Sequence, residues 1–163
     1  MGCRPDAKIR CGMDTPFIIL AGVGLFLIVG WLHDRKRADD VRELANRCGF
    51  AYIGAAFPRS LTLHGTPFER VSSIWNVIDG QCHGIRVVAF DCRIGSGKGS
   101  WSRTAIAVQT PRDISRIRKF SGDLAVDRSG EWAVMYQPRT FSLIPLGLTP
   151  VRELEARLGS ISN

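Results

Sequence analysis

A run of sixteen uncharged residues, FIILAGVGLFLIVGWL, from Phe17 to Leu32 constrains this chain more than any other feature. At 1.5 Å per helical residue it nearly crosses a hydrocarbon core of about 30 Å, and Thr15, Pro16 and the basic side chains after Leu32 extend it. A cleaved signal peptide is the alternative, but its apolar core is shorter and ends in small residues, whereas this run ends in Trp31, Leu32 and a basic cluster. The sequence therefore predicts one transmembrane helix over residues 16–34.

The basic residues on either side of this run predict its orientation. Three of them, Arg4, Lys8 and Arg10, precede it, and five follow it, namely Arg35, Lys36, Arg37, Arg42 and Arg47. Because Lys and Arg concentrate on the cytoplasmic side of an anchor, we expect the C-terminal domain to be cytoplasmic. Residues 1–15 are interpreted as a tail, and Met13 as an alternative start that would leave no Lys or Arg ahead of the run.

Charge and cysteine usage limit the partners of the chain. From Ala38 onward there are 16 Lys and Arg against 12 Asp and Glu, so much of the net charge of +7 flanks the anchor. This distribution favours anionic lipid headgroups, or a membrane protein partner, over nucleic acid. Cys48, Cys82 and Cys92 lack a CxxC pair, so neither a disulfide framework nor a metal site is predicted, and a reducing compartment fits. No cofactor is implied.

The residues after the anchor predict an α+β domain. Apolar residues at spacings of three and four predict a juxtamembrane amphipathic helix over 35–49. The domain over 50–163 then begins with a short strand at Phe50–Ile53. Three further strands are expected at 71–78, 85–92 and 104–110, with a turn from Asp79-Gly80 to Gly84 between the first two. A second hairpin is expected at 123–126 and 131–136, and a helix capped by Thr149 at 149–158.

The loop from Asp91 to Lys98 carries the main catalytic alternative. A phosphate-binding loop requires GxxxxGK[ST], but Cys92 stands at its first glycine and Gly99 at its Ser/Thr, so we interpret Gly95 to Ser102 as a loop between strands. Adjacent Cys82 and His83 would point to opposite faces of a strand, which does not suit a metal. No catalytic residue is predicted, and a small membrane-tethered enzyme using this loop, with His83 nearby, stays an alternative.

A second basic cluster lies between Arg112 and Lys119. Its members Arg116, Arg118 and Lys119 are candidates, together with Arg35, Lys36 and Arg37, for a lipid- or partner-binding surface. The other interpretation is a solvated face with Ile114 and Ile117 turned inward.

Several short segments resemble a family of uncharacterised bacterial single-pass membrane proteins with an NVLxG…FD…GxGK-type β domain. The segments are Asn76-Val77-Ile78-Asp79-Gly80, Gly84-Ile85-Arg86-Val87, Phe90-Asp91, Gly95-Ser96-Gly97-Lys98, Met135-Tyr136-Gln137-Pro138-Arg139 and Val151 to Leu158. Cys92 departs from the aromatic residue that usually follows Phe-Asp. The resemblance implies an N-terminal anchor in the bacterial inner membrane and an α+β domain, without an activity to carry over. We therefore expect a membrane-anchored, cytoplasmic, membrane-proximal binding or scaffold module.

Overall fold

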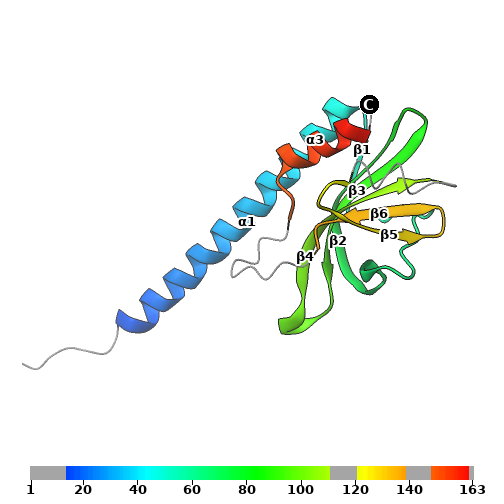
Figure 1. Cartoon of the computed structure of the whole chain (residues 1–163). Coiled ribbons are helices and arrows are strands. Elements are labelled where there is room, and N and C mark those ends of the chain that lie inside the picture. The colour runs from blue at the N-terminus through cyan, green and yellow to red at the C-terminus, as the bar shows by residue number, and fades with distance from the viewer. Residues whose placement is uncertain (1–13, 111–120, 139–147, 162–163) are drawn as a thin grey trace, which may run out of the picture. The chain divides into compact units, whose positions relative to one another are not determined.

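The computed structural model describes residues 14–110, 121–138 and 148–161, and these form two compact units, Met1–Arg37 and Ala38–Asn163 (Figure 1). Helix α1, Asp14–Cys48, is uninterrupted, because neither Gly nor Pro occurs between Leu32 and Cys48. The predicted spanning helix and juxtamembrane helix are therefore parts of one element.

Helix α1 ends in a hydrogen-bonded cap at Gly49. Gly49 has a φ of 70°, its N–H donates to the Asn46 carbonyl at 3.3 Å, and the Phe50 N–H donates to the Ala45 carbonyl at 2.8 Å. This pair of bonds is the Schellman motif, which needs a left-handed residue after the helix and so favours glycine. The cap turns the chain directly into the first strand.

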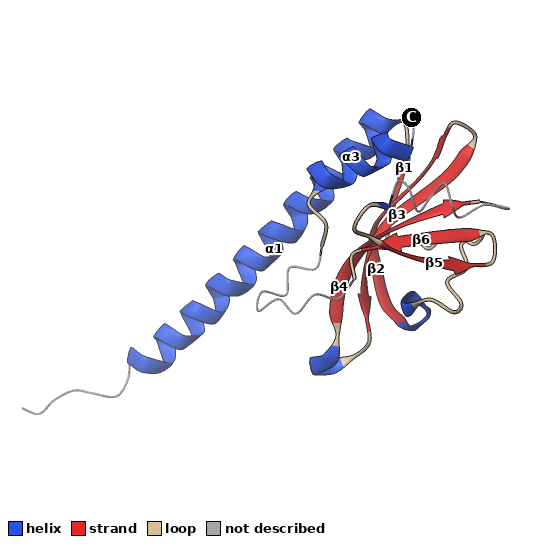
Figure 2. Ribbon diagram, viewed as in Figure 1, coloured by secondary structure: helices blue, strands red, loops and turns tan. Residues whose placement is uncertain are grey.

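A six-stranded antiparallel sheet forms the centre of the second unit (Figure 2), in the order β1-β2-β3-β4-β6-β5. Its strands are β1 Ala51–Gly54, β2 Val71–Cys82, β3 Ile85–Ile94, β4 Trp101–Gln109, β5 Ala125–Ser129 and β6 Trp132–Tyr136, and helix α3 is Val151–Ile161. Strands β2, β3 and β4 form a meander and β5 and β6 a hairpin, as predicted. The α+β fold class is confirmed.

The predicted start of the β2–β3 turn at Asp79-Gly80 is wrong, and its predicted end at Gly84 is confirmed. Strand β2 continues to Cys82, and the connection to β3 is the two-residue turn His83-Gly84, with φ values of 50° and 78°. Positive φ at both central residues is the geometry that matches the twist of a hairpin. Asp79 stays in the ladder opposite Val88, where its side chain has a partner described below.

A β-bulge divides β2 at Asn76. The pairing of β2 with β3 shifts register between Trp75 and Ile78, and Asn76 has a φ of 52°. Asparagine tolerates this left-handed conformation better than other non-glycine residues. The bulge aims the Asn76 side chain at β3 and separates the two halves of β2.

The sheet is covered on both faces. On one face, residues 38–48 of α1 and helix α3 contribute Val41, Leu44, Ala45, Leu154 and Leu158 to a core that includes Ile78, Val87 and Ile106. On the other, the connection between β1 and β2 contributes Leu61, Leu63 and Phe68 to a core around Phe90 and Trp132. Two apolar layers therefore enclose the sheet and fix the positions of its polar residues.

Candidate functional site

The apolar part of α1 is exposed. Between Ile18 and Leu32, eleven large apolar side chains are exposed, among them Phe26 at 78 %, and only Phe57 and Ile85 join them elsewhere in the described residues. One helix in the described part of the chain is long and apolar enough to span a membrane. Continuous apolar surface of this kind marks a membrane or protein contact.

The predicted basic residues Arg35, Lys36 and Arg37 lie on α1 directly after this surface. The Arg35 guanidinium carbon is 5.2 Å from the centre of the Trp31 ring, a cation–π distance. Lys36 is exposed. The amphipathic Trp31 ring and its basic neighbour have the chemistry of a membrane–water interface. The other three predicted residues, Arg116, Arg118 and Lys119, lie outside the described residues.

Asp91 is the centre of a buried hydrogen-bond network. Its side chain is 2 % exposed, its Oδ1 accepts from the Thr104 hydroxyl at 2.7 Å, and its Oδ2 accepts from the Asn76 amide at 2.9 Å. Asn76 Oδ1 accepts from the Tyr52 hydroxyl at 3.2 Å, and Thr104 Oγ1 accepts from the Thr149 N–H at 2.9 Å. A buried carboxylate needs such donors. The network joins four strands to the start of α3.

The residues named for the catalytic alternative are far apart. His83 lies in the turn before β3, Asp91 lies within β3, and Lys98 lies in the short 3-10 helix Gly97–Gly99 after it. At about 3.3 Å per residue, the ten residues of β3 separate the two turns by roughly 30 Å. The structure therefore does not bring these three residues together. Within residues 14–110, 121–138 and 148–161, no group of three potential metal ligands occurs.

Cys92 is a core residue rather than a nucleophile. Its side chain has no exposed surface, and burial, followed by the neighbouring Asp91 charge, raises the pKa of its thiol to about 12. Burial also raises the pKa of the half-buried Cys48 thiol. Because the thiolate is the reactive form, both shifts reduce reactivity.

Charged residues at the β2–β3 turn are paired. This hairpin end, residues 79–86, carries Asp79 and Arg86, whose Nε donates to Asp79 Oδ1 at 3.0 Å. Arg86 also donates to the Ser60 hydroxyl at 2.6 Å and lies 5.9 Å from the Trp132 ring centre. The hydrogen bond to Asp79 raises the pKa of Arg86.

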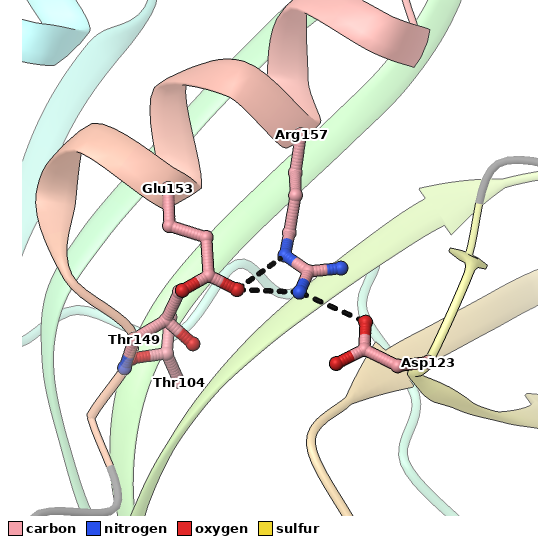
Figure 3. Close-up of polar contacts among 5 residues, drawn as sticks. All are labelled: Thr104, Asp123, Thr149, Glu153 and Arg157. Atoms are coloured by element: carbon pink, nitrogen blue, oxygen red, sulfur yellow. Dashed lines mark hydrogen bonds and ion pairs between the residues drawn. The ribbon is translucent and has the colours of Figure 1, made fainter.

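A second set of ion pairs attaches α3 to the segment before β5 (Figure 3). Arg157 lies between Glu153, one turn earlier on the helix, and Asp123, whose Oδ1 accepts from it at 3.1 Å. This hydrogen bond lowers the pKa of Asp123. The arginine is largely buried, so its stem also packs between the helix and the sheet.

The opposite end of the meander has a different charge pattern, which the sequence analysis missed. Its basic tip, residues 70–75 and 93–103, contains Arg70, Arg93, Lys98 and Arg103 and has neither Asp nor Glu. Arg70 and Arg93 are exposed, and within the described residues neither forms a salt bridge. The signal was available in the sequence, but the two segments become neighbours only through the β2–β3 pairing.

Two tryptophans accompany the arginines of the basic tip. Trp75 and Trp101 are both partly buried, and the Arg103 guanidinium carbon is 4.9 Å from the centre of the Trp101 ring. Trp75 lies opposite Asp91, and Trp101 lies opposite Ile94. The tip therefore combines exposed cations with amphipathic rings.

Comparison of this chain with models of protein families, with curated proteins and with solved structures gave no match.

Proposed function

We propose that this protein is a membrane-anchored binding or scaffold module. In this proposal the apolar part of α1 spans the bacterial inner membrane, and the Ala38–Asn163 unit stays at its cytoplasmic surface. The observation that carries the proposal is the exposed apolar surface between Ile18 and Leu32, because it covers about 22 Å of α1, most of the roughly 30 Å of a bilayer core. Arg35, Lys36 and Arg37 at its end support the cytoplasmic orientation.

The proposed resemblance to single-pass bacterial membrane proteins concerns architecture. Residues that carry it have structural roles here: Asn76 donates to Asp91, and Gly80 leaves room for the Phe50 ring, which would lie 2.1 Å from an added Cβ. A family pattern built on such residues would preserve a scaffold. It supports a binding module more than it supports a shared reaction.

Membrane extraction and reporter fusions test the proposal. The full chain, expressed in a Gram-negative bacterium, should stay in the membrane pellet after alkaline carbonate extraction. A C-terminal green fluorescent protein should fluoresce, and a C-terminal alkaline phosphatase should be inactive, because the latter folds only in the periplasm. Release by carbonate would refute the anchor, and an active phosphatase would refute the orientation.

A control variant separates the apolar run from the rest of the chain. Replacing Leu25 and Leu27 by Arg places two charges at the middle of the run, where each costs about 2.5–3.5 kcal/mol of insertion free energy. This variant should appear in the soluble fraction or be degraded. Replacing Arg59 and Arg128, which are exposed on the second unit, by Gln should leave the fractionation unchanged.

A further inference from the structure

We propose that the basic tip is a second membrane contact, which binds the phosphate groups of anionic lipids in the bilayer that holds the anchor. This inference rests on the proposed membrane anchoring and adds to it a named surface and a lipid class. Three observations carry it: the charge of the tip, its tryptophans, and the presence of the anchor in the same chain.

The tip carries an excess of basic residues, although the exposed Glu69 directly precedes Arg70 and interacts with its charge. Four basic residues occur in 70–75 and 93–103 without an acidic one, and the nearest carboxylate in β3, Asp91, is buried and accepts two hydrogen bonds. Arginine suits this role because its planar guanidinium donates two parallel hydrogen bonds to a phosphate.

The tryptophans favour a bilayer surface over bulk solvent. Trp and Tyr rings concentrate at the level of lipid headgroups, where one edge is apolar and the other wet. Trp75 and Trp101 are partly buried, and Trp101 packs against the second core. The tip therefore presents the exposed Arg70 and Arg93 together with two amphipathic rings.

Within the second unit, residues 38–48 of α1 run along the sheet toward the hairpin end. The last turn of α1 lies at the hairpin end, since Phe50, just beyond it, packs over Gly80. Arg42, earlier in the helix, lies 4.9 Å from the Tyr52 ring centre, and the Tyr52 hydroxyl reaches Asn76 at the bulge. Residues 38–48 therefore run from the bulge toward the hairpin end, and Ala38 precedes Arg42 on the tip side.

Figure 1 shows the β2–β3 and β3–β4 turns at opposite ends of the sheet. Because the anchor directly precedes Ala38 in the chain, an anchored chain raises the effective concentration of lipid headgroups around the second unit. Single-stranded nucleic acid also binds basic surfaces with aromatic rings, but an anchor in the same chain favours lipid.

Hydrogen exchange of the full chain in nanodiscs tests this contact. Amides of residues 95–100 are compared in phosphatidylcholine discs and in discs that also contain phosphatidylglycerol. We expect slower exchange in the anionic discs and loss of the difference at high salt, because the headgroup attraction is screened. Equal exchange in both discs would overturn the proposal. This lipid comparison uses the unaltered chain, so it decides the question without any variant.

Matched variants then assign the effect to the tip. Arg70→Gln with Arg93→Gln should reduce the added protection by up to about thirtyfold, since each arginine at the surface changes the attraction about fivefold. Arg59→Gln with Arg128→Gln removes the same charge away from the tip and should keep the protection. Equal loss in both double variants would overturn the assignment to the tip.

The remaining outcomes distinguish a failure of the proposed anchor from a failure of the proposed tip contact. A chain that enters neither disc refutes the anchor, and with it this inference. A chain that enters both discs, without protection by phosphatidylglycerol, refutes the tip contact alone. If a single-stranded oligonucleotide protects residues 95–100 in phosphatidylcholine discs and anionic lipid does not, the tip is a nucleic-acid surface and the lipid assignment is wrong.

Discussion

The two ends of the β2–β3–β4 meander use charged residues in opposite ways. At the hairpin end, Arg86 is held by Asp79, the Ser60 hydroxyl and the face of Trp132. At the basic tip, Arg70 and Arg93 are exposed, and the Gly95 N–H and the Ser72 hydroxyl donate to their backbone carbonyls. The charged residues of the hairpin end therefore stabilise the fold, whereas the arginines of the basic tip are available for a ligand.

Between these ends lies a row of polar residues that belongs to the fold. Asp91 accepts hydrogen bonds from Asn76 in β2 and from Thr104 in β4. The Thr104 hydroxyl oxygen in turn accepts from the Thr149 N–H. Both oxygens of the carboxylate are occupied within the protein. Within β3, the buried Asp91 therefore has a structural role, whereas Arg93, about two residues later, is exposed and available to a ligand.

The thiol of Cys92, which lies in β3 just before the tip, should be unreactive in the folded chain, and this is the largest effect we predict. The pKa of the Cys92 thiol is raised from 9.0 to about 12, which lowers its thiolate fraction at neutral pH by about a thousandfold. Iodoacetamide should label Cys92 only after unfolding, whereas Cys48 should be labelled in the folded chain. Mass spectrometry of the peptides measures both.

The sign of the pH dependence follows from the same shift. Because the thiolate is the reactive form and the raised pKa of Cys92 keeps its thiol protonated, raising the pH over the range in which the chain stays folded should increase labelling of Cys48 and leave Cys92 unlabelled. Labelling of Cys92 as fast as Cys48 at neutral pH would mean that the tip opens to solvent.

Breaking the row at Asp91 should be the most destabilising substitution. Asp91→Ala leaves the Asn76 amide and the Thr104 hydroxyl without their buried acceptor and should lower the free energy of unfolding by about 3–5 kcal/mol. Urea unfolding of the second unit, followed in the full chain by tryptophan fluorescence, measures it. Asp127→Ala, which removes a partner of the Tyr136 hydroxyl at the sheet edge, is the control and should cost less than half as much.

The sequence predicted the architecture because apolar periodicity and turn residues report on local structure. The apolar run, the meander, the second hairpin and the closing helix all follow from such patterns. The turn at His83-Gly84 did not, because Asp79-Gly80 is the stronger turn signal and only pairing with Arg86 across the ladder keeps it in β2. The polar row and the basic tip depend on residues far apart in sequence, which one sequence does not place together.

Glycine substitutions should show that the hairpin end is more tightly packed than the basic tip. In Gly80→Ala the new Cβ would lie 2.1 to 2.7 Å from ring atoms of the buried Phe50, so we expect a loss of about 2–3 kcal/mol in unfolding free energy. Gly99→Ala in the tip meets nothing within 4 Å and should change stability by less than about 0.5 kcal/mol. Equal losses from the two substitutions would contradict the contrast between a packed end and an open one.

The ion pair at the hairpin end should make a measurable but modest contribution. The side chains of Arg86 and Asp79 are 32 % and 19 % exposed, so solvent screens part of their attraction. A double-mutant cycle with Asp79→Asn and Arg86→Gln should give a coupling free energy of about 1 kcal/mol. The more exposed pair Arg47–Glu155, at 46 % and 43 %, should couple more weakly, because solvent screens it more. If the coupling of Arg86 with Asp79 were no larger than that of Arg47 with Glu155, the ion pair at the hairpin end would not differ from an ordinary surface pair.

The smallest effect should come from the arginines of the tip. The Arg70 carbonyl accepts from the Gly95 N–H at 3.2 Å, and the Arg93 carbonyl accepts from the Ser72 hydroxyl at 3.1 Å. Both bonds use the backbone and persist in Arg70→Gln with Arg93→Gln, so the unfolding free energy should change by less than about 0.5 kcal/mol. Urea unfolding in zwitterionic lipid measures it, beside the Arg86→Gln variant, which should lose more. A loss of more than about 1 kcal/mol for the tip variant would mean that these arginines hold the strands together, and their charge would then have a structural role instead of being available to lipid phosphates.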